Sequence, residues 1–123
     1  MMSDLALATP GSLGRLFSGA DDLTLAPGRG GGTNGFVVRT DEAASRFRVD
    51  YHGASYLDHV ERARDEGLGV STVDSFRLST DVDEPDDIVE VLIHGDGESH
   101  DYVDGLFELV SDDDENRVTI RRR

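Results

Sequence analysis

The feature that most constrains the fold is the stretch 87–123, where two Asp-Gly dipeptides and one acidic loop separate four short apolar runs. Asp-Gly between apolar runs is a strong signal for a tight β-hairpin, because both central residues of the turn need a positive φ. Turns at Asp96-Gly97, at Asp104-Gly105 and at residues 112–115 give one consistent pairing of the four runs. The pattern therefore predicts a four-stranded antiparallel meander over residues 87–122.

The three turns place one set of side chains on a single buried face, and a slip of one residue at any turn would break this agreement. On the opposite face Glu108 lies diagonal to Arg117 and Arg121, so cross-strand ion pairs are expected, whereas Asp101 lies unfavourably across from Glu108. The predicted buried face consists of Val89, Val91, Ile93, His100, Tyr102, Phe107, Leu109, Val118 and Ile120.

An alternative for the segment 99–110 is a helix. Gly105 in the middle of that helix would cost about 1 kcal/mol, so the meander is favoured and the helix stays open as the alternative. The residues that follow helical spacing after Ser99 are Tyr102, Val103, Leu106, Phe107 and Val110.

The clearest helix pattern upstream covers about 55–66. Ser55 and Asp58 resemble a capping box, and Gly67 follows the last turn. Short strands are expected at 23–25, 36–39, 46–51 and 70–78. Thr9 and Pro10 suit the start of a short helix in the N-terminal segment 1–22, which either covers the domain as a lid or serves as a partner-binding arm.

These patterns predict a β-dominated α+β fold. It is a curved antiparallel sheet or a partly open small barrel that ends in the four-stranded meander (87–122), with one helix (about 55–66) packed on it. The length of 123 residues suits a single α+β domain over 23–123, preceded by the segment 1–22.

Charge indicates the solvent in which the chain works. The formal net charge is −14, Asp far outnumbers Glu, and all 12 Lys and Arg side chains are arginine. This acidic composition resembles that of proteins from salt-loving organisms, because concentrated salt screens the repulsion between surface carboxylates. The acidity is therefore interpreted as halophilic adaptation and not as DNA mimicry.

The absence of cysteine excludes disulfides and zinc-thiolate sites. No apolar run reaches the length of a membrane span, and the first residues lack the basic start of a signal peptide. A cytoplasmic location without membrane association is therefore expected, and no cofactor is predicted.

Two groups of residues could carry chemistry. The segment 94–101 holds two histidines and three carboxylates, so His94, Asp96 and Asp101 are candidates for a divalent metal site or for acid and base catalysis. The meander opposes this, because it puts His94 and His100 on opposite faces. The second group, Asp50, His52 and His59, joins a strand end to a helix and could transfer a proton. No nucleophile motif is present.

Two further loops attract functional readings. The loop Gly28–Gly35 could cradle phosphate, but it lacks the Lys-Ser/Thr pair and the following helix of a P-loop, so a mobile connection is favoured. The acidic segment 81–87 resembles a calcium loop only in its charge, because the required glycine and glutamate positions hold Asp86 and Leu92. Loose association of cations is the preferred reading there.

The arginines at the C-terminal end form the one concentration of positive charge in the sequence. They could contact nucleic acid or an acidic partner, although phosphate contacts weaken steeply with salt. The alternative is that they neutralise the acidic residues 112–115. The residues concerned are Arg117, Arg121, Arg122 and Arg123.

Two functions of different class follow. The leading hypothesis is a small acidic accessory or regulatory module that binds a protein partner, or nucleic acid beside one. The alternative is a small metal-dependent hydrolase or isomerase that uses one of the two His/Asp groups. The sequence leaves the partner, the substrate and the oligomeric state open.

Overall fold

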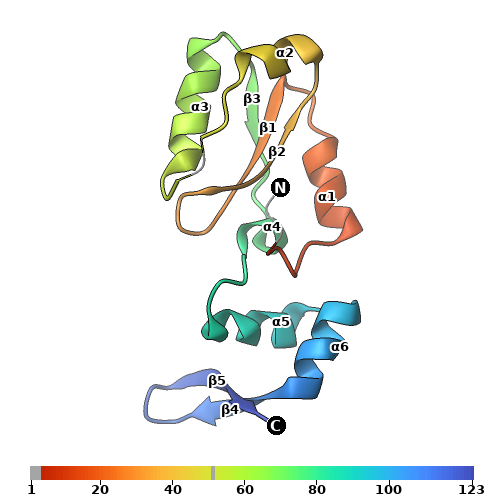
Figure 1. Ribbon diagram of the computed structural model, residues 1–123, viewed down its shortest axis with the longest axis vertical. Coiled ribbons are helices and arrows are strands. Elements are labelled where there is room, and N and C mark those ends of the chain that lie inside the picture. Colours follow the sequence, from red (N-terminus) through yellow and green to blue (C-terminus); the bar gives the residue numbers. More distant parts are fainter. Residues whose placement is uncertain (1–3, 51) are drawn as a thin grey trace.

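The computed structural model describes residues 4–50 and 52–123 (Figure 1). Within these residues the chain has six α-helices, one 3-10 helix and five strands, and the strands form two small sheets. The mixed α/β class predicted from the sequence is confirmed. The prediction that β-structure dominates is wrong, and neither described sheet closes into a barrel.

The larger sheet has three strands in the order β2-β1-β3. The central strand β1 (Leu23–Pro27) pairs antiparallel with β2 (Thr33–Val38) and parallel with β3 (Val70–Thr72). The expected strands at 23–25 and 36–39 are thus confirmed. The strand expected over 70–78 ends early, because Ser75 caps the short helix α4 (Phe76–Ser79) and its side chain accepts from Leu78 N.

Helices cover both faces of this sheet, as the alternation of β1 requires. On one face Leu23 and Leu25 pack in a cluster with Ala63 of α3 (Ser55–Asp65). On the other face Ala26 packs with Leu16 of α1 (Pro10–Phe17) and with Leu78 of α4. Both clusters therefore draw their residues from the range 8–78.

The local signals at two helix starts had different outcomes. Thr9 caps α1 as predicted, since its side chain accepts from Ser12 N, and Pro10 occupies the first helical position. The helix expected at about 55–66 is α3. The capping box predicted for it is wrong, because the N-cap is Ala54 and the Ser55 hydroxyl accepts from Thr33 N.

The strand predicted over 46–51 is wrong within the described residues. Arg46 ends the helix α2 (Asp41–Arg46), and residues 47–50 have no regular structure. Phe47 packs in the core, but Val49, which has the same parity in the predicted strand, is exposed, so the apolar alternation of the sequence does not correspond to burial in this segment. Tyr51, the last residue of that prediction, lies outside the described residues.

The first half of the predicted meander is helical. The 3-10 helix η1 (Pro85–Asp87) leads into α5 (Ile88–His94), and α6 (Gly97–Leu106) follows. Asp96 and Gly97 start α6 and do not form a hairpin turn: Asp96 is the N-cap residue, and Gly97 supplies a φ of 79°. The helical alternative for the segment from 99 was correct as far as Leu106.

The hairpin of β4 (Phe107–Asp112) and β5 (Arg117–Arg122) confirms the last turn of the predicted meander with a shifted register. Leu109 lies opposite Ile120 and not Val118. The shift preserves the face of each side chain and places Glu108 directly opposite Arg121. The loop ends at Asn116, whose φ of 53° is in the left-handed region that asparagine tolerates.

The C-terminal part, residues 85–122, lies beyond α4 in the elongated molecule (Figure 1). The α5 and α6 helices pack beside the β4-β5 hairpin, and Val91 is the buried apolar side chain among these described residues. No helix in the described part of the chain is long and apolar enough to cross a membrane.

Candidate functional site

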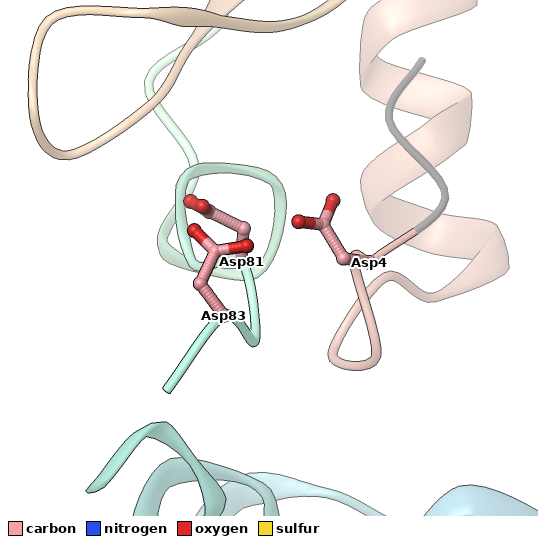
Figure 2. A group of neighbouring side chains, drawn as sticks. All are labelled: Asp4, Asp81 and Asp83. Carbon is pink, nitrogen blue, oxygen red and sulfur yellow. The ribbon is translucent and has the colours of Figure 1, made fainter. Parts of the chain in front are cut away.

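Three aspartates from distant parts of the sequence meet beside the end of α4 (Figure 2). Asp4 comes from the segment before α1, and Asp81 and Asp83 come from the extended chain after α4. Their ligand oxygens lie within 4.8 Å of one another. The backbone holds the two segments together, because Val82 N donates to Asp4 O at 2.9 Å.

The extended chain at 81–83 has alternating side chains, so Asp81 and Asp83 leave it on the same side. Asn34 fixes the first of them, because its Nδ2 donates to Leu78 O at 2.9 Å and to Asp81 Oδ1 at 3.3 Å. Asp87 fixes the backbone at Asp83, since its Oδ2 accepts from Asp83 N at 2.9 Å. Asn34 therefore holds the Asp81 carboxylate, and Asp87 holds the backbone at Asp83.

Crowding of the carboxylates changes their protonation. A proton shared with Asp81, followed by a hydrogen bond to Asp4, raises the pKa of Asp83 to about 7. The same shared proton, together with the Asn34 hydrogen bond, lowers the pKa of Asp81 below its ordinary value. Asp4 Oδ1 is buried and has no hydrogen-bond partner among the described residues. This arrangement suits a bound cation, because a cation would occupy the position of the shared proton.

An open pocket of about 500 Å³ adjoins the aspartates. Its wall combines the acidic residues with the glycine-rich loop between β1 and β2. In that loop Gly28 N donates to Gly32 O at 2.8 Å, and Gly31 has a φ of 95°. The residues that line the pocket are Arg29, Gly30, Asp81, Asp83, Glu84 and Asp87.

Glycine is required at position 28 for a steric reason. An added Cβ there would lie 2.7 Å from Asn34 Oδ1, the side chain that reaches Asp81. Gly28 therefore packs closely against Asn34 next to the aspartates, and the mobile connection expected from the sequence stays a prediction.

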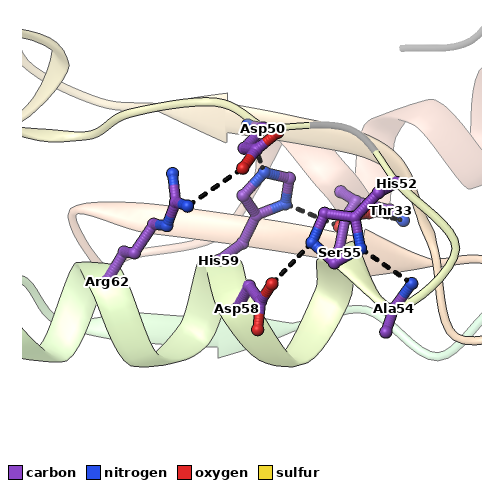
Figure 3. Close-up of polar contacts among 8 residues, drawn as sticks. All are labelled: Thr33, Asp50, His52, Ala54, Ser55, Asp58, His59 and Arg62. Atoms are coloured by element: carbon purple, nitrogen blue, oxygen red, sulfur yellow. Dashed lines mark hydrogen bonds and ion pairs between the residues drawn. The ribbon is translucent and has the colours of Figure 1, made fainter.

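The second candidate group of the sequence, Asp50, His52 and His59, lies together at the start of α3 (Figure 3). Its contacts differ from those of a proton-transfer pair. The Asp50 carboxylate pairs with Arg62 at 2.9 Å, and His52 Nε2 contacts Asp58 at 2.5 Å.

His59 is fully buried and bonds to backbone and hydroxyl groups. Its Nε2 accepts from Asp50 N at 3.0 Å, and its Nδ1 lies 2.7 Å from Thr33 Oγ1. Burial, followed by the charge of Arg62, lowers the pKa of His59. A neutral histidine in this position ties the start of α3 to β2.

The first candidate group, His94, Asp96 and Asp101, does not converge. His94 ends α5, where it lies 3.4 Å from Glu90 and stacks edge-on against Phe76. Asp96 is the N-cap of α6, and Asp101 lies one turn further along that helix. The group with mutually close ligand atoms, within the described ranges 4–50 and 52–123, is the aspartate trio instead.

The C-terminal arginines are largely engaged by acidic neighbours. Arg117 lies 2.7 Å from Glu115, Arg121 lies 2.6 Å from Glu108, and Arg123 lies 3.2 Å from Asp104. The Glu108–Arg121 pair confirms the cross-strand ion pair expected from the sequence. Binding of nucleic acid or an acidic partner through Arg117, Arg121, Arg122 and Arg123 stays a prediction.

Sequence reasoning missed the aspartate trio. The available signal was the Asp-Val-Asp alternation at 81–83, which was compared only with a calcium loop. Its third member, Asp4, is nearly eighty positions away in the sequence. Only the packing of the segment before α1 against the end of α4 brings Asp4 there.

Comparison with known proteins gives a consistent result. A family model described as "Guanylyl transferase CofC like" matches residues 1–122. A 2-phospho-L-lactate guanylyltransferase from Halomicrobium mukohataei is 53% identical over 122 residues, which are 99% of this chain and 58% of that relative. The protein of the same name from Natronomonas pharaonis is 49% identical over 124 residues, 100% of this chain and 59% of the relative.

A third relative of that name, from Haloquadratum walsbyi, is 51% identical over 124 residues but only 38% of it is covered. The chain thus spans between about four tenths and six tenths of the length of these relatives. All three are named as transferases. This finding overturns both functions predicted from the sequence, the non-enzymatic accessory or regulatory binding module and the metal-dependent hydrolase or isomerase.

Proposed function

Because the chain belongs to the family of CofC-like guanylyl transferases, we propose that Asp4, Asp81 and Asp83 bind the divalent cation used in a guanylyl transfer. The relatives are named for transfer to 2-phospho-L-lactate, and we propose that this chain contributes to the same reaction. The observation that carries the proposal is the convergence of three carboxylates beside a glycine-rich loop.

The chemistry explains the need for a cation. Transfer of a guanylyl group to a phosphorylated acid brings two phosphate groups together, and both carry negative charge. A hard divalent cation with oxygen ligands supplies neutralisation of that charge. An all-aspartate donor set, with no cysteine in the chain, fits magnesium or manganese better than a softer metal.

The residues around the trio have complementary tasks in this proposal. Asn34 orients Asp81 through its amide, and Asp87 holds the backbone at Asp83. The Arg29 side chain lines the same pocket and offers the positive charge that a phosphate group needs. The backbone of Gly30 lets a phosphate approach closely, because no side chain intervenes there.

Manganese binding tests the proposal. Binding rather than turnover is measured, because the chain spans only part of its relatives. In about 2 M KCl, where surface charges are screened, calorimetry of the full chain should detect one manganese site. Asp81→Asn and Asp83→Asn should each weaken it about tenfold or more, since each removes an anionic oxygen ligand.

Asp113→Asn is the matched control, since it removes the same charge from the exposed β4-β5 loop. It should leave manganese affinity unchanged. Equal loss of affinity in Asp81→Asn and Asp113→Asn would mean that the metal only senses overall charge, and the proposed site would be wrong.

Two predictions from the sequence stay beside this proposal. The cytoplasmic location and the adaptation to concentrated salt both rest on composition and remain predictions.

A further inference from the structure

We propose that His59 is a positioning residue for the aspartate site, which it serves by fixing Thr33 and the bulge in β2 that follows. The next residue of the chain, Asn34, then holds its amide against Asp81. The inference deepens the proposed function and rests on it for the bound metal. The three aspartates stay the proposed ligands, and His59 acts on them through its neighbours.

The first step is the contact between His59 and Thr33. The Nδ1 of His59 lies 2.7 Å from Thr33 Oγ1, and its Nε2 accepts from Asp50 N at 3.0 Å, so both ring nitrogens are engaged (Figure 3). Both side chains are buried, with 0% of His59 and 3% of Thr33 exposed. A buried hydroxyl needs a hydrogen-bond partner. The His59 ring therefore sets the direction of the Thr33 side chain.

The first turn of α3 holds the backbone around Thr33 with two further bonds. Ser55 Oγ accepts from Thr33 N at 3.0 Å, and Tyr56 N donates to Gly31 O at 3.1 Å. The Ser55 hydroxyl also lies 3.4 Å from Thr33 Oγ1, which is longer than the 2.7 Å contact of His59. His59 is therefore the closer partner of the Thr33 hydroxyl.

His59 is a polar side chain within the apolar cluster on this face of the sheet. Its ring packs edge-on against Phe47, with 5.5 Å between the ring centres, and Ala63 of the same helix belongs to that cluster. Burial of a polar ring costs free energy that an apolar side chain would not cost. A fully bonded polar network, however, specifies one arrangement of its members. The position therefore suits the orientation of neighbours better than the filling of a core.

The second step is a shift of register in β2 directly after Thr33. Thr33 lies opposite Pro27, and the pairing resumes with Gly35 opposite Ala26, so Asn34 is the extra residue on β2. A bulge of this kind redirects a side chain, and bulges are frequent next to active sites. Because Thr33 is the residue before the bulge, its anchoring by α3 fixes where Asn34 begins.

The third step is the contact of Asn34 with Asp81. The Nδ2 of Asn34 donates to Leu78 O at 2.9 Å and to Asp81 Oδ1 at 3.3 Å. Gly28 confines the amide from the other side, since an added Cβ there would lie 2.7 Å from Asn34 Oδ1. Partners that orient a metal ligand typically change metal affinity about 10-fold to 100-fold when they are lost. Loss of the His59 anchor should therefore weaken metal binding without removal of a ligand.

Two variants of His59 separate its two bonds. His59→Asn places an amide donor near the position of Nδ1 and keeps the bond to Thr33, whereas His59→Gln places an amide oxygen near Nε2 and keeps the bond from Asp50. Calorimetry of the full chain with manganese in about 2 M KCl should show an affinity about tenfold weaker for His59→Gln, and within about threefold of wild type for His59→Asn. The melting temperature should fall in both, because each loses one buried hydrogen bond.

The side-chain amide of Asn34 reports the route without any metal. Its N–H groups are bonded in the wild type, and NMR should show their exchange with water to be about tenfold faster in His59→Gln than in His59→Asn. This measurement separates the inference from the proposed function. Manganese that fails to bind the wild-type chain would overturn the metal site, while the exchange of Asn34 still decides the role of His59.

Ala63→Gly is the matched control for a general loosening of α3. Ala63 is buried one turn beyond His59 in the same helix, and glycine weakens a helix interior. The variant should lower the melting temperature and leave both the manganese affinity and the exchange of Asn34 unchanged.

Three results would overturn the inference. The first is an equal loss of manganese affinity in His59→Asn and His59→Gln. The second is an exchange of the Asn34 amide in His59→Gln that matches the wild type. The third is a loss of affinity in Ala63→Gly as large as that in His59→Gln. If His59→Gln fails to fold, Thr33→Val removes the same bond from the other partner and should weaken manganese about tenfold. Full affinity in that variant would also overturn the inference.

Discussion

At the scale of single residues, His59 is a buried base with a defined tautomer. Because Asp50 N–H donates to Nε2, the proton of the neutral ring lies on Nδ1 and is donated to Thr33 Oγ1. Protonation of Nε2 would place a second N–H opposite the N–H of Asp50, so that two donors would face each other without an acceptor. This conflict agrees with the lowered pKa that burial and Arg62 cause.

The lowered pKa of His59 predicts a dependence of stability on pH. A base whose pKa is lowered on folding contributes fully above its unfolded pKa of about 6.5, and the contribution is lost as pH falls below it. We expect the advantage of the wild type over His59→Phe in free energy of unfolding to decrease progressively as the pH falls through about 6.5. Urea unfolding of both proteins on either side of this pH measures the difference. A difference that stays constant with pH would mean that folding does not lower the pKa of His59.

Asp83 predicts a pH dependence of metal binding. Its pKa is raised to about 7 by the shared proton, so a metal has to displace a proton below that pH. Manganese affinity should rise about tenfold per pH unit below about 7 and level off above it, because one proton is released. Calorimetry in buffers of different ionisation enthalpy counts this proton.

The control for this behaviour is Asp83→Asn, which cannot bind the proton. Its residual affinity should depend little on pH over the same range. The expectation fails if the variant retains the slope of the wild type, since another group would then titrate.

At the scale of elements, the capping box of α1 should carry much of the stability of that helix. Thr9 Oγ1 accepts from Ser12 N at 3.1 Å, and Ser12 Oγ accepts from Thr9 N at 2.8 Å. Thr9→Ala should lower the free energy of unfolding by about 1 kcal/mol. Thermal unfolding checks the value, with Ser99→Ala on the exposed side of α6 as a control that should change little.

Elements whose first residues carry a local start signal could be predicted from the sequence. Segments whose apolar residues fit both the alternation of a strand and the spacing of a helix could not. Thr9-Pro10 indicates a helix start, and the apolar alternation of 23–25 indicates a strand. Both predictions were correct. In the segment 88–94 the residues Val89, Val91 and Ile93 alternate, while Ile88, Val91 and Leu92 have helical spacing. The deciding signal was the helix start at Glu84-Pro85, where Glu84 and Asp87 form a capping box.

The candidate site shows the same limit at longer range. The sequence correctly brought Asp50, His52 and His59 into one neighbourhood, because a turn and a helix start connect them locally. It could not join Asp4 to Asp81 and Asp83, since that contact depends on how two distant segments pack. Local chemistry predicts local neighbours, and a site made by tertiary packing needs the fold.

At the scale of the whole molecule, stability is distributed unevenly. Both core clusters draw their described residues from the part of the chain before residue 79. In the part after residue 87, Ile93, Tyr102 and Val118 expose between 44% and 73% of their surface. An isolated two-stranded hairpin is marginally stable in water, so β4 and β5 depend on their packing against α5 and α6.

This uneven core and the net charge of −14 together predict how the molecule responds to salt. The Debye length grows from about 3 Å at 1 M salt to about 10 Å at 0.1 M, so repulsion between surface carboxylates strengthens as salt is removed. We expect the melting temperature to fall with decreasing KCl. Amide exchange should accelerate first in residues 88–122, because less burial opposes the repulsion there.

A variant with Asp113→Asn and Asp114→Asn tests the cause of this salt response. Both side chains lie in the exposed loop between β4 and β5, so their neutralisation reduces repulsion without removing core contacts. The variant should lose less protection in residues 88–122 at low salt than the wild type does, while the exchange of β1 should be the same in both proteins. Uniform acceleration along the chain would instead mean that the two parts unfold as one cooperative unit, and the stability of the C-terminal part would then equal that of the core.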